Sequence, residues 1–376
     1  MHITDEPGTL NVRQFGAVGD GVADDTDPIQ RALDSHAPTV YIPPGTYTIR
    51  RALLIHSGTR LHADAAATIR LADRAGSGVD LFLLTNRNHL EGDRHIVIEG
   101  GRWDGNCAHN ARVSEADRPG YTGVAINLVH VRDLTVRNLT VINPDSFSIR
   151  LGEVEDFVVE DITLDHPISR PNQDGVHVGG FSQRGVIRRI IAVTSNTPND
   201  DMVALNADDD VERVLNVGMK RGFIRDILVE EIVAPDAYTF LRLLSVDAPI
   251  DNVTVRDVRG GCRMYAVNMN NWRFPRGVGN IHHVRLERFQ VRKSDPQNTL
   301  PLIDVALWAE DVVVRDFRRD DAAASPAPTL LVRNGRANRL LLDDGAGVRT
   351  ITTREGEEFS FAGERIARLE LNASGG

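Results

Sequence analysis

Three aspartates lie in two short runs whose residue types suit acid–base chemistry. Asp174 belongs to an Asn-Gln-Asp-Gly run at 172–175, and Asp200 and Asp201 belong to an Asn-Asp-Asp-Met run at 199–202, 26 and 27 residues further on. A protonated carboxyl group can donate a proton to a leaving group while an ionised carboxylate activates water. Carboxylates held close together raise one another's pKa, so one of them can stay protonated near neutral pH. Asp174, Asp200 and Asp201 are therefore the candidate catalytic residues.

Several polar side chains are predicted to lie beside these carboxylates and to contact a substrate. In short strands such as 176–178 and 241–243, a middle residue between two apolar neighbours points outward. This alternation predicts an outward row of Ser148, His177, Ala204, Arg242 and Asn268. An outward structural histidine and a surface ion pair are the competing interpretations for His177 and Arg242. The substrate-binding candidates are Asn172, His177, Arg242, Asn268, Trp272 and Arg150.

Two further acidic runs are weighed against simpler explanations. Asp24 and Asp25 precede Pro28 at the start of a predicted helix, so capping explains them and they are excluded from the site. The run 208–210 is Asp-Asp-Asp, which could offer oxygen ligands to Ca²⁺. A solvated loop is the preferred interpretation, and we predict no metal and no cofactor.

The elements that must position these residues recur along the chain. From about residue 95, short alternating strands are followed by longer strands that carry an Arg/Glu–Asp/Asn pair in mid-run, as at 137–138, 160–161, 256–257 and 315–316. The period varies between about 23 and 38 residues, which suits coils of three short strands and three turns. Alternation at period two indicates strands with one buried face. The pattern predicts an all-β, right-handed parallel β-helix of about nine to ten coils.

The whole chain, 1–376, is predicted to form a single β-helix domain. Residues 1–50 are expected to form an N-terminal cap with a helix at about 26–36, because an open solenoid end exposes unpaired strand edges. The coils are predicted over 51–345, with long loops at 206–222 and 270–280. Residues 346–376 are expected to form a C-terminal cap and tail.

Composition excludes several classes of function. The chain has 376 residues and a net charge of −10, without a basic run, which disfavours nucleic-acid and anionic-membrane binding. No stretch of 18 apolar residues is present, so no membrane span is predicted. The two cysteines, Cys107 and Cys262, are expected to be buried thiols. No signal peptide is recognisable at the N-terminus, which favours a cytoplasmic protein unless a leader has been removed.

A resemblance to a known superfamily rests on three segments. The run Phe-Gly-Ala-Val-Gly-Asp-Gly at 15–21, with the Pro-Pro-Gly-Thr-Tyr turn at 43–47, resembles the opening segment of pectin-degrading β-helix proteins. Trp-Asp-Gly-Asn at 103–106 is similar to a step carried by hydrolases of this group. The paired runs at 172–176 and 199–206 resemble the polygalacturonase family, glycoside hydrolase family 28. The resemblance implies inverting hydrolysis, with Asp200 as the acid and Asp174 and Asp201 holding the water.

The chain departs from that family at two motifs. None of its 12 histidines lies between two glycines, and neither of its two lysines, Lys220 and Lys293, has an arginine two residues before it. The family's Gly-His-Gly and Arg-x-Lys motifs are therefore missing. In the family the Arg-x-Lys pair grips the galacturonate carboxylate, so a neutral or unusual sugar, or a galacturonate held by Arg242, is expected here.

The leading hypothesis is thus a polygalacturonase-type inverting glycoside hydrolase that acts on a poly- or oligosaccharide, as a monomer or small homo-oligomer. A β-elimination lyase or an epimerase on the same fold is the first alternative, because Arg242 could serve near the sugar C5 atom and the acidic loop could hold Ca²⁺. A non-catalytic carbohydrate-binding or tailspike-like module is the second alternative.

Overall fold

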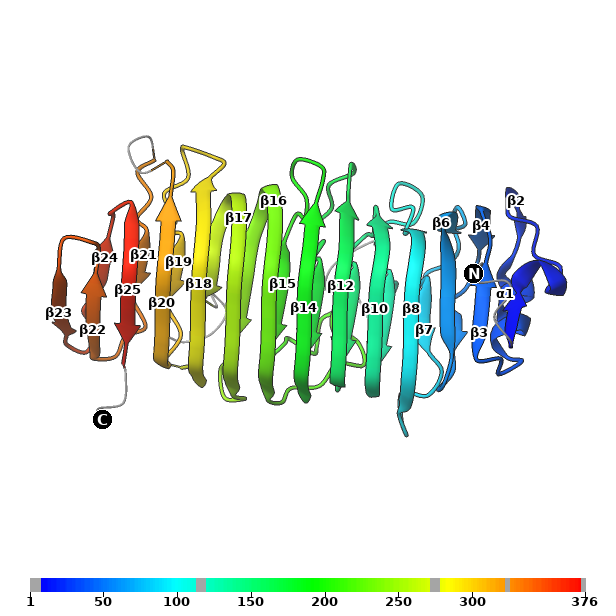
Figure 1. The fold of residues 1–376 in the computed structure, drawn as a ribbon, viewed down its shortest axis with the longest axis horizontal. Helices are drawn as coiled ribbons and strands as arrows, with labels where there is room; N and C mark the ends of the chain where they lie inside the picture. The colour runs from blue at the N-terminus through cyan, green and yellow to red at the C-terminus, as the bar shows by residue number, and fades with distance from the viewer. Residues whose placement is uncertain (1–7, 113–119, 271–277, 322–324, 373–376) are drawn as a thin grey trace.

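The short and long strands of each repeat stack in parallel along one axis, which gives an elongated solenoid (Figure 1). The computed structural model describes residues 8–112, 120–270, 278–321 and 325–372. Within these ranges, no helix is long and apolar enough to cross a membrane. The parallel β-helix predicted from the repeat is therefore confirmed.

The short strands form one sheet, which carries the site residues. Each pairs in parallel with the equivalent strand of the next coil, and the two rows between β15 and β19 are formed by the final segments of two long strands, β16 and β17. The short strands are β5 (Leu53–Ile55), β7 (Leu84–Asn86), β9 (Ile126–Val129), β11 (Ile149–Gly152), β13 (Val176–Gly179), β15 (Asp201–Asn206), β19 (Ile303–Val305) and β21 (Leu330–Val332).

The long strands build the other walls of the solenoid and face the viewer in Figure 1. They are β6 (Arg60–Leu71), β8 (Asp93–Asp104), β10 (Val131–Ile142), β12 (Glu155–Asp165), β14 (Ser182–Ala192), β16 (Ile224–Leu244), β17 (Ile250–Met269), β18 (Ile281–Lys293) and β20 (Ala309–Arg319). Their inward residues alternate with outward ones and are buried, with aromatic side chains such as Trp103, Phe157 and Phe289 filling the core.

The Arg/Glu–Asp/Asn pair of the repeat marks a bend within each long strand. Asn138, Asp161, Asp257 and Asp316 have φ values of 55°, 56°, 60° and 49°. Asn and Asp tolerate this left-handed conformation better than other residues with a side chain. The repeated pair is therefore the sequence signature of the corner that turns one sheet into the next.

The two ends of the solenoid are covered differently. At the N-terminal end lie β1 (Thr9–Asn11), β2 (Asp20–Asp24), α1 (Thr26–Leu33), β3 (Thr39–Ile42), β4 (Gly45–Ile49) and the 3₁₀ turn Val12–Phe15. At the C-terminal end, β22 (Asn338–Asp343), β23 (Val348–Thr353), β24 (Phe359–Phe361) and β25 (Arg365–Leu371) pair antiparallel, and β25 lies against β20. Both arrangements pair strand edges that would otherwise be open.

The N-terminal helix begins where the sequence indicates, but it ends at Leu33 and not near residue 36. Asp24 Oδ1 accepts from the Thr26 backbone N–H at 3.0 Å, while Asp25 accepts from the Val18 and Gly19 N–H groups. The capping prediction holds for Asp24, but it is wrong for Asp25, whose side chain makes no hydrogen bond to the helix and holds the preceding turn instead. Both aspartates lie outside the site.

Candidate active site

The three candidate carboxylates meet at the edge of the short-strand sheet. Asp174 lies just before β13, and Asp200 and Asp201 lie at the start of β15, one coil later. The register Val176 to Val203 aligns the two strand starts, and one oxygen of each carboxylate lies within 4.8 Å of the others. The prediction that stacking brings these aspartates together is confirmed by this geometry.

The glycine after Asp174 permits the close stacking. A Cβ atom on Gly175 would meet the Met202 carbonyl oxygen at 2.5 Å and Leu164 Cδ1 at 2.7 Å. Its own N–H donates to the Asp201 carbonyl at 2.9 Å. The Asp-Gly pair of the motif thus combines a functional carboxylate with the one residue type that lets the next coil approach.

Burial gives these carboxylates unusual proton affinities. Asp174 and Asp201 are each 3% exposed, and Asp200 is partly buried. Burial, reinforced by the charge of Asp174, raises the pKa of Asp200 to about 7. Burial also raises the pKa of Asp201 well above its usual range, with the charge of Asp200 adding to the effect. The cluster therefore holds at least one shared proton near neutral pH.

His177 is clamped between two carboxylates. Its Nδ1 lies 2.7 Å from Asp174 Oδ2, its Nε2 lies 2.8 Å from Asp209 Oδ2, and its ring stacks on Phe147 with centroids 4.0 Å apart. Burial alone would lower the pKa of His177, but Asp209 and Asp174 raise it to about 10. The imidazolium therefore donates to both carboxylates. His177 lines the cavity, but neither ring nitrogen is available to a substrate, because Asp174 and Asp209 engage both of them.

Asp174 is thereby oriented by His177. With Oδ2 held by the imidazolium, Asp174 Oδ1 is buried and has no hydrogen-bond partner among the described residues. This oxygen can accept a hydrogen bond from a donor such as water or a substrate hydroxyl.

Arg242 lines the same cavity from the next coil, in register with Ala204. Its guanidinium makes no hydrogen bond or ion pair within the described parts of the chain. Its positive charge lowers the pKa of Asp200, Asp201 and Asp174, although burial outweighs it in each case. The surface ion pair considered as the alternative for Arg242 is not formed, and the guanidinium is available to an anionic group of a ligand.

The structure places the other substrate-binding candidates differently relative to the cavity. Asn172 lines the cavity, and its Nδ2 donates to Asp200 Oδ2 at 3.2 Å, so it also positions a candidate catalytic carboxylate. Asn268 follows Arg242 in register and is 6% exposed, with a buried Oδ1 that lacks a partner, but it does not line the cavity. Trp272 lies outside the described residues.

Arg150 is a structural residue, which corrects its assignment to substrate binding. It is 1% exposed, donates through Nε to Asn127 Oδ1 at 2.8 Å, and donates through Nη1 to the Leu215 carbonyl. Register places Arg150, not Ser148, beside His177 in the outward row. Ser148 and Arg150 are two residues apart and therefore point to the same face of the strand. The prediction thus gave the correct face but the wrong residue in the row.

The run 208–210 is neither a solvated loop nor a metal cluster. Asp208 and Asp209 are 5% and 3% exposed. Asp208 Oδ2 accepts from three consecutive backbone N–H groups, at 246–248, and Asp209 holds His177. Among the described residues, the acidic group whose oxygens converge closely enough for a cation is Asp174, Asp200 and Asp201.

The cavity has a volume of about 240 Å³ and brings in residues that sequence reasoning missed. Its lining includes Asn206, Asp209, Arg213, Asn216 and Tyr238. Asn206 ends the same run that contains Asp200, and its position at the end of β15 could have indicated that it lies near the site. Arg213 and Asn216 lie just before and at the end of the short 3₁₀ helix Val214–Asn216, in a connection whose sequence carries no period that would reveal their direction.

Comparison with known proteins identifies the family. Residues 9–197 match the family model described as rhamnogalacturonase A/epimerase, pectate lyase-like. A probable polygalacturonase of Arabidopsis thaliana is 25% identical over 269 residues, which cover 66% of this chain and 57% of the relative. The chain thus spans little more than half of that relative. It belongs to the rhamnogalacturonase A/epimerase, pectate lyase-like family, within the right-handed β-helix superfamily.

Two solved structures show the same fold. The family 28 exopolygalacturonase of Yersinia enterocolitica superposes with a TM-score of 0.60 at 19% identity, covering 84% of this chain and 71% of that one. The pre-mature gene product 12 of bacteriophage phi29 superposes with a TM-score of 0.65 at 16% identity, covering 86% and 44%. Identities this low establish the fold, and the activity must be argued from the site.

Proposed function

We propose that this protein is a polygalacturonase-type glycoside hydrolase that cleaves a poly- or oligosaccharide with inversion at the anomeric carbon. The observation that carries the proposal is the convergence of Asp174, Asp200 and Asp201, with oxygens within 4.8 Å, in a cavity that also presents Arg242. Two stacked carboxylate motifs in one cavity supply both the acid and the base that hydrolysis needs.

The three carboxylates divide the work by their surroundings. Asp174, paired with His177, is the ionised group whose free Oδ1 accepts a proton from water. Asp200 and Asp201 share a proton, and Asp200, the more exposed of the two, donates it to the leaving glycosidic oxygen. The water oxygen bonds to the anomeric carbon as the glycosidic bond breaks, so the proton gained by Asp174 balances the one lost by the acid.

The stereochemical outcome rests on the family resemblance. In most inverting enzymes the two carboxyl groups stand about 6.5–9.5 Å apart, and in retaining enzymes about 5–5.5 Å. The 4.8 Å measured here joins single oxygens, which approach more closely than whole carboxyl groups do. Inversion is therefore a separate claim from hydrolysis, and product NMR measures it directly.

Arg242 favours a sugar that carries a carboxylate. It is a cation without a partner in the described structure, facing a cavity otherwise rich in acceptor oxygens. A planar guanidinium binds carboxylates in a bidentate manner. In this proposal Arg242 takes the role of the missing Arg-x-Lys pair and binds a galacturonate-like residue next to the cleaved bond.

The proposal is tested by incubating the protein with oligogalacturonides, rhamnogalacturonan oligosaccharides and neutral galactans, with NMR of the first products. We expect new reducing ends of inverted configuration and no unsaturated sugar. Asp174→Asn and Asp200→Asn should abolish this product while leaving the fold intact. Equal turnover by parent and variants would overturn the catalytic assignment.

A lyase or epimerase is the second candidate, favoured by one observation. The oxygens of the three aspartates lie close enough together to hold a cation, and the family's description includes epimerases. Activity that is lost with EDTA, restored by Ca²⁺ and accompanied by ultraviolet absorbance of the product would support this reading. Binding of the same oligosaccharides without any turnover would instead support a non-catalytic module.

A further inference from the structure

The connection between β15 and β16, residues 207–223, folds back over the short-strand sheet on the N-terminal side of the carboxylates. Leu215 is 1% exposed and packs in an apolar cluster with Phe82, Val124 and Phe147. The buried Arg150 guanidinium donates to the Leu215 carbonyl. A polysaccharide lying along the sheet would meet this connection at the coil of β11, so the cavity is closed on that side by described residues.

The connection is held firmly in this position. A Cβ atom on Gly180 would meet the Gly222 nitrogen at 2.4 Å and the Lys220 carbonyl oxygen at 2.5 Å, and one on Gly179 would meet Met219 Cε at 2.2 Å. The end of β13 therefore has glycine where the connection touches it. Asp209, which belongs to the connection, is bonded to His177, so the wall and the catalytic cluster are one hydrogen-bonded unit.

Two asparagines that line the cavity carry acceptor oxygens without a partner among the described residues. Asn206 and Asn216 are 6% and 2% exposed, both line the cavity, and the Oδ1 atom of each is buried without a hydrogen bond. Their amide orientation is fixed, because Asn206 Nδ2 donates to Asp209 Oδ1 at 3.1 Å and Asn216 Nδ2 donates to the Asp210 carbonyl at 3.0 Å. Buried acceptors in this state are normally satisfied by a donor such as water or a ligand hydroxyl.

We propose that this closed end is a subsite for the terminal sugar of a chain, in which Asn206 and Asn216 accept hydrogen bonds from its hydroxyl groups. The inference rests on the proposed hydrolytic function and deepens it, since a closed subsite restricts cleavage to bonds near a chain end. Both amide oxygens are hydrogen-bond acceptors, which suit hydroxyl donors and not an ionised carboxylate, so the hydroxyl-bearing edge of the terminal sugar faces these two residues. The carboxylate of the sugar is bound by Arg242, which comes from a later coil.

The first experiment measures where cleavage occurs. Oligogalacturonides and rhamnogalacturonan oligosaccharides are offered with both ends free, with the reducing end reduced, or with an unsaturated non-reducing end. We expect one short product of fixed length from the earliest times, and at least a tenfold loss of rate when one of the two ends is altered. A broad ladder of early products, with hydrolysis intact, would overturn the terminal subsite and leave the proposed function standing.

The second experiment measures binding without turnover. Calorimetry with galacturonate, rhamnose and galactose as separate probes should show one of them binding, with affinity reduced about tenfold in Asn216→Ala and in Asn206→Ala. Gln297→Ala is the matched control, because it removes an exposed amide side chain in the turn after β18, far along the chain from the cavity residues. If neither site variant weakens binding of any probe, the subsite assignment is wrong, whether or not the protein hydrolyses a chain. Thermal denaturation of each variant separates lost contacts from lost folding.

Discussion

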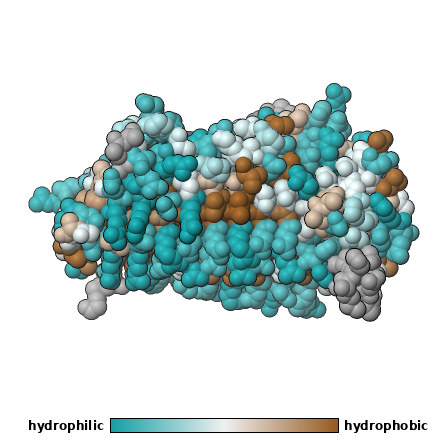
Figure 2. Space-filling view, turned by 45° about the horizontal axis from the view of Figure 1, so that its top comes forward, coloured by the Kyte–Doolittle hydropathy of each residue, from teal (hydrophilic) through white to brown (hydrophobic). Residues whose placement is uncertain are grey.

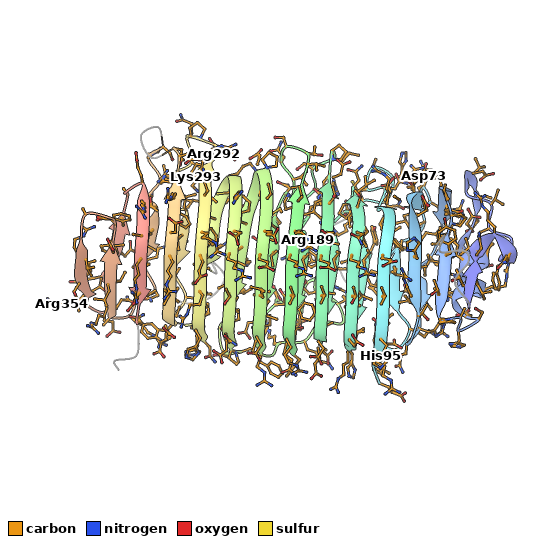
Figure 3. All side chains as sticks on the ribbon, in the orientation of Figure 1. Asp73, His95, Arg189, Arg292, Lys293 and Arg354 are labelled. Atoms are coloured by element: carbon orange, nitrogen blue, oxygen red, sulfur yellow. The ribbon has the colours of Figure 1, made fainter. Side chains whose placement is uncertain are left out.

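The outer face of the long strands and the cavity both stack charged side chains from coil to coil, with opposite results. On the outer face, register aligns glutamate and arginine in strict alternation in the charge ladder, formed by Glu99, Arg137, Glu160, Arg188, Glu230, Arg256, Glu287 and Arg315. Arg189 projects from the same face, which is largely hydrophilic (Figures 2 and 3). In the cavity, three aspartates from adjacent coils lie together, and His177, Arg213 and Arg242 line the same cavity.

The difference appears in the pKa values of the carboxyl groups. Burial opposes ionisation of Glu99, but hydrogen bonds from His62, Arg60 and Arg137 lower its pKa to about 2. Burial and a neighbouring carboxylate raise the pKa of Asp200 to about 7. The same stacking of coils therefore makes a carboxylate permanently ionised where charges alternate, and makes it a proton donor where like charges meet.

The strongest test of this contrast compares one substitution at the two regions. Asp200→Asn removes the proposed acid, and we expect at least a thousandfold loss of kcat with the preferred oligosaccharide. Asp161→Asn, at a left-handed corner of the outer face where Asn is well tolerated, should retain parental activity. Steady-state kinetics of both purified variants measure the two values of kcat. Equal losses of kcat in both variants would show that Asp200 is not the acid.

Arg242→Gln is expected to have the next largest effect. Loss of the guanidinium should raise KM about ten- to a hundredfold for a substrate with a carboxylate, and much less for a neutral one. Because Arg242 lowers the pKa of the three aspartates, its removal should also move the alkaline limb of the pH profile upward. An unchanged pH profile would show that the guanidinium acts only on the ligand.

The dependence of activity on pH should follow the shared proton. Asp200 donates only while protonated, so kcat should fall about tenfold per pH unit above about pH 7. On the acidic side, protonation of Asp174 removes the base, and its raised pKa places that limb above the usual range for aspartate. A pH–rate profile of the parent measures both limbs, and a flat profile from pH 6 to 9 would contradict the role of Asp200.

The smallest effect is expected on the outer face. Glu99→Gln removes a buried carboxylate whose pKa is lowered, so the parent gains stability from this group above about pH 4.5 and loses it as pH falls towards 2. We expect a loss of about 2 kcal/mol at pH 7 and a smaller difference at pH 2.5. Urea unfolding at both pH values measures this, with the exposed Glu355→Gln as control. A difference that does not shrink at low pH would point to packing.

The sequence predicted the fold and the proximity of the three aspartates well, for a local reason. Alternation at period two shows which residues form strands and which side chains point inward. The recurring corner residues, such as Asp161, mark where each coil turns, and neither signal requires knowledge of distant contacts. The motifs of Asp174 and Asp200 sit at strand starts one coil apart, so stacking alone brings them together. The prediction that Ser148 lies beside His177 in the outward row was wrong, because the alignment of that strand was off by two residues and Arg150 takes the place.

The partners of each side chain were decided by tertiary structure. The sequence by itself determined a parallel solenoid and three carboxylates at one edge, since a regular coil converts spacing along the chain into proximity. It did not determine that both ring nitrogens of His177 would be held by Asp174 and Asp209, or that Arg150 would be buried and donate to the Leu215 carbonyl. Those outcomes depend on the irregular connection 207–223, whose path follows from packing on distant strands and has no period to read.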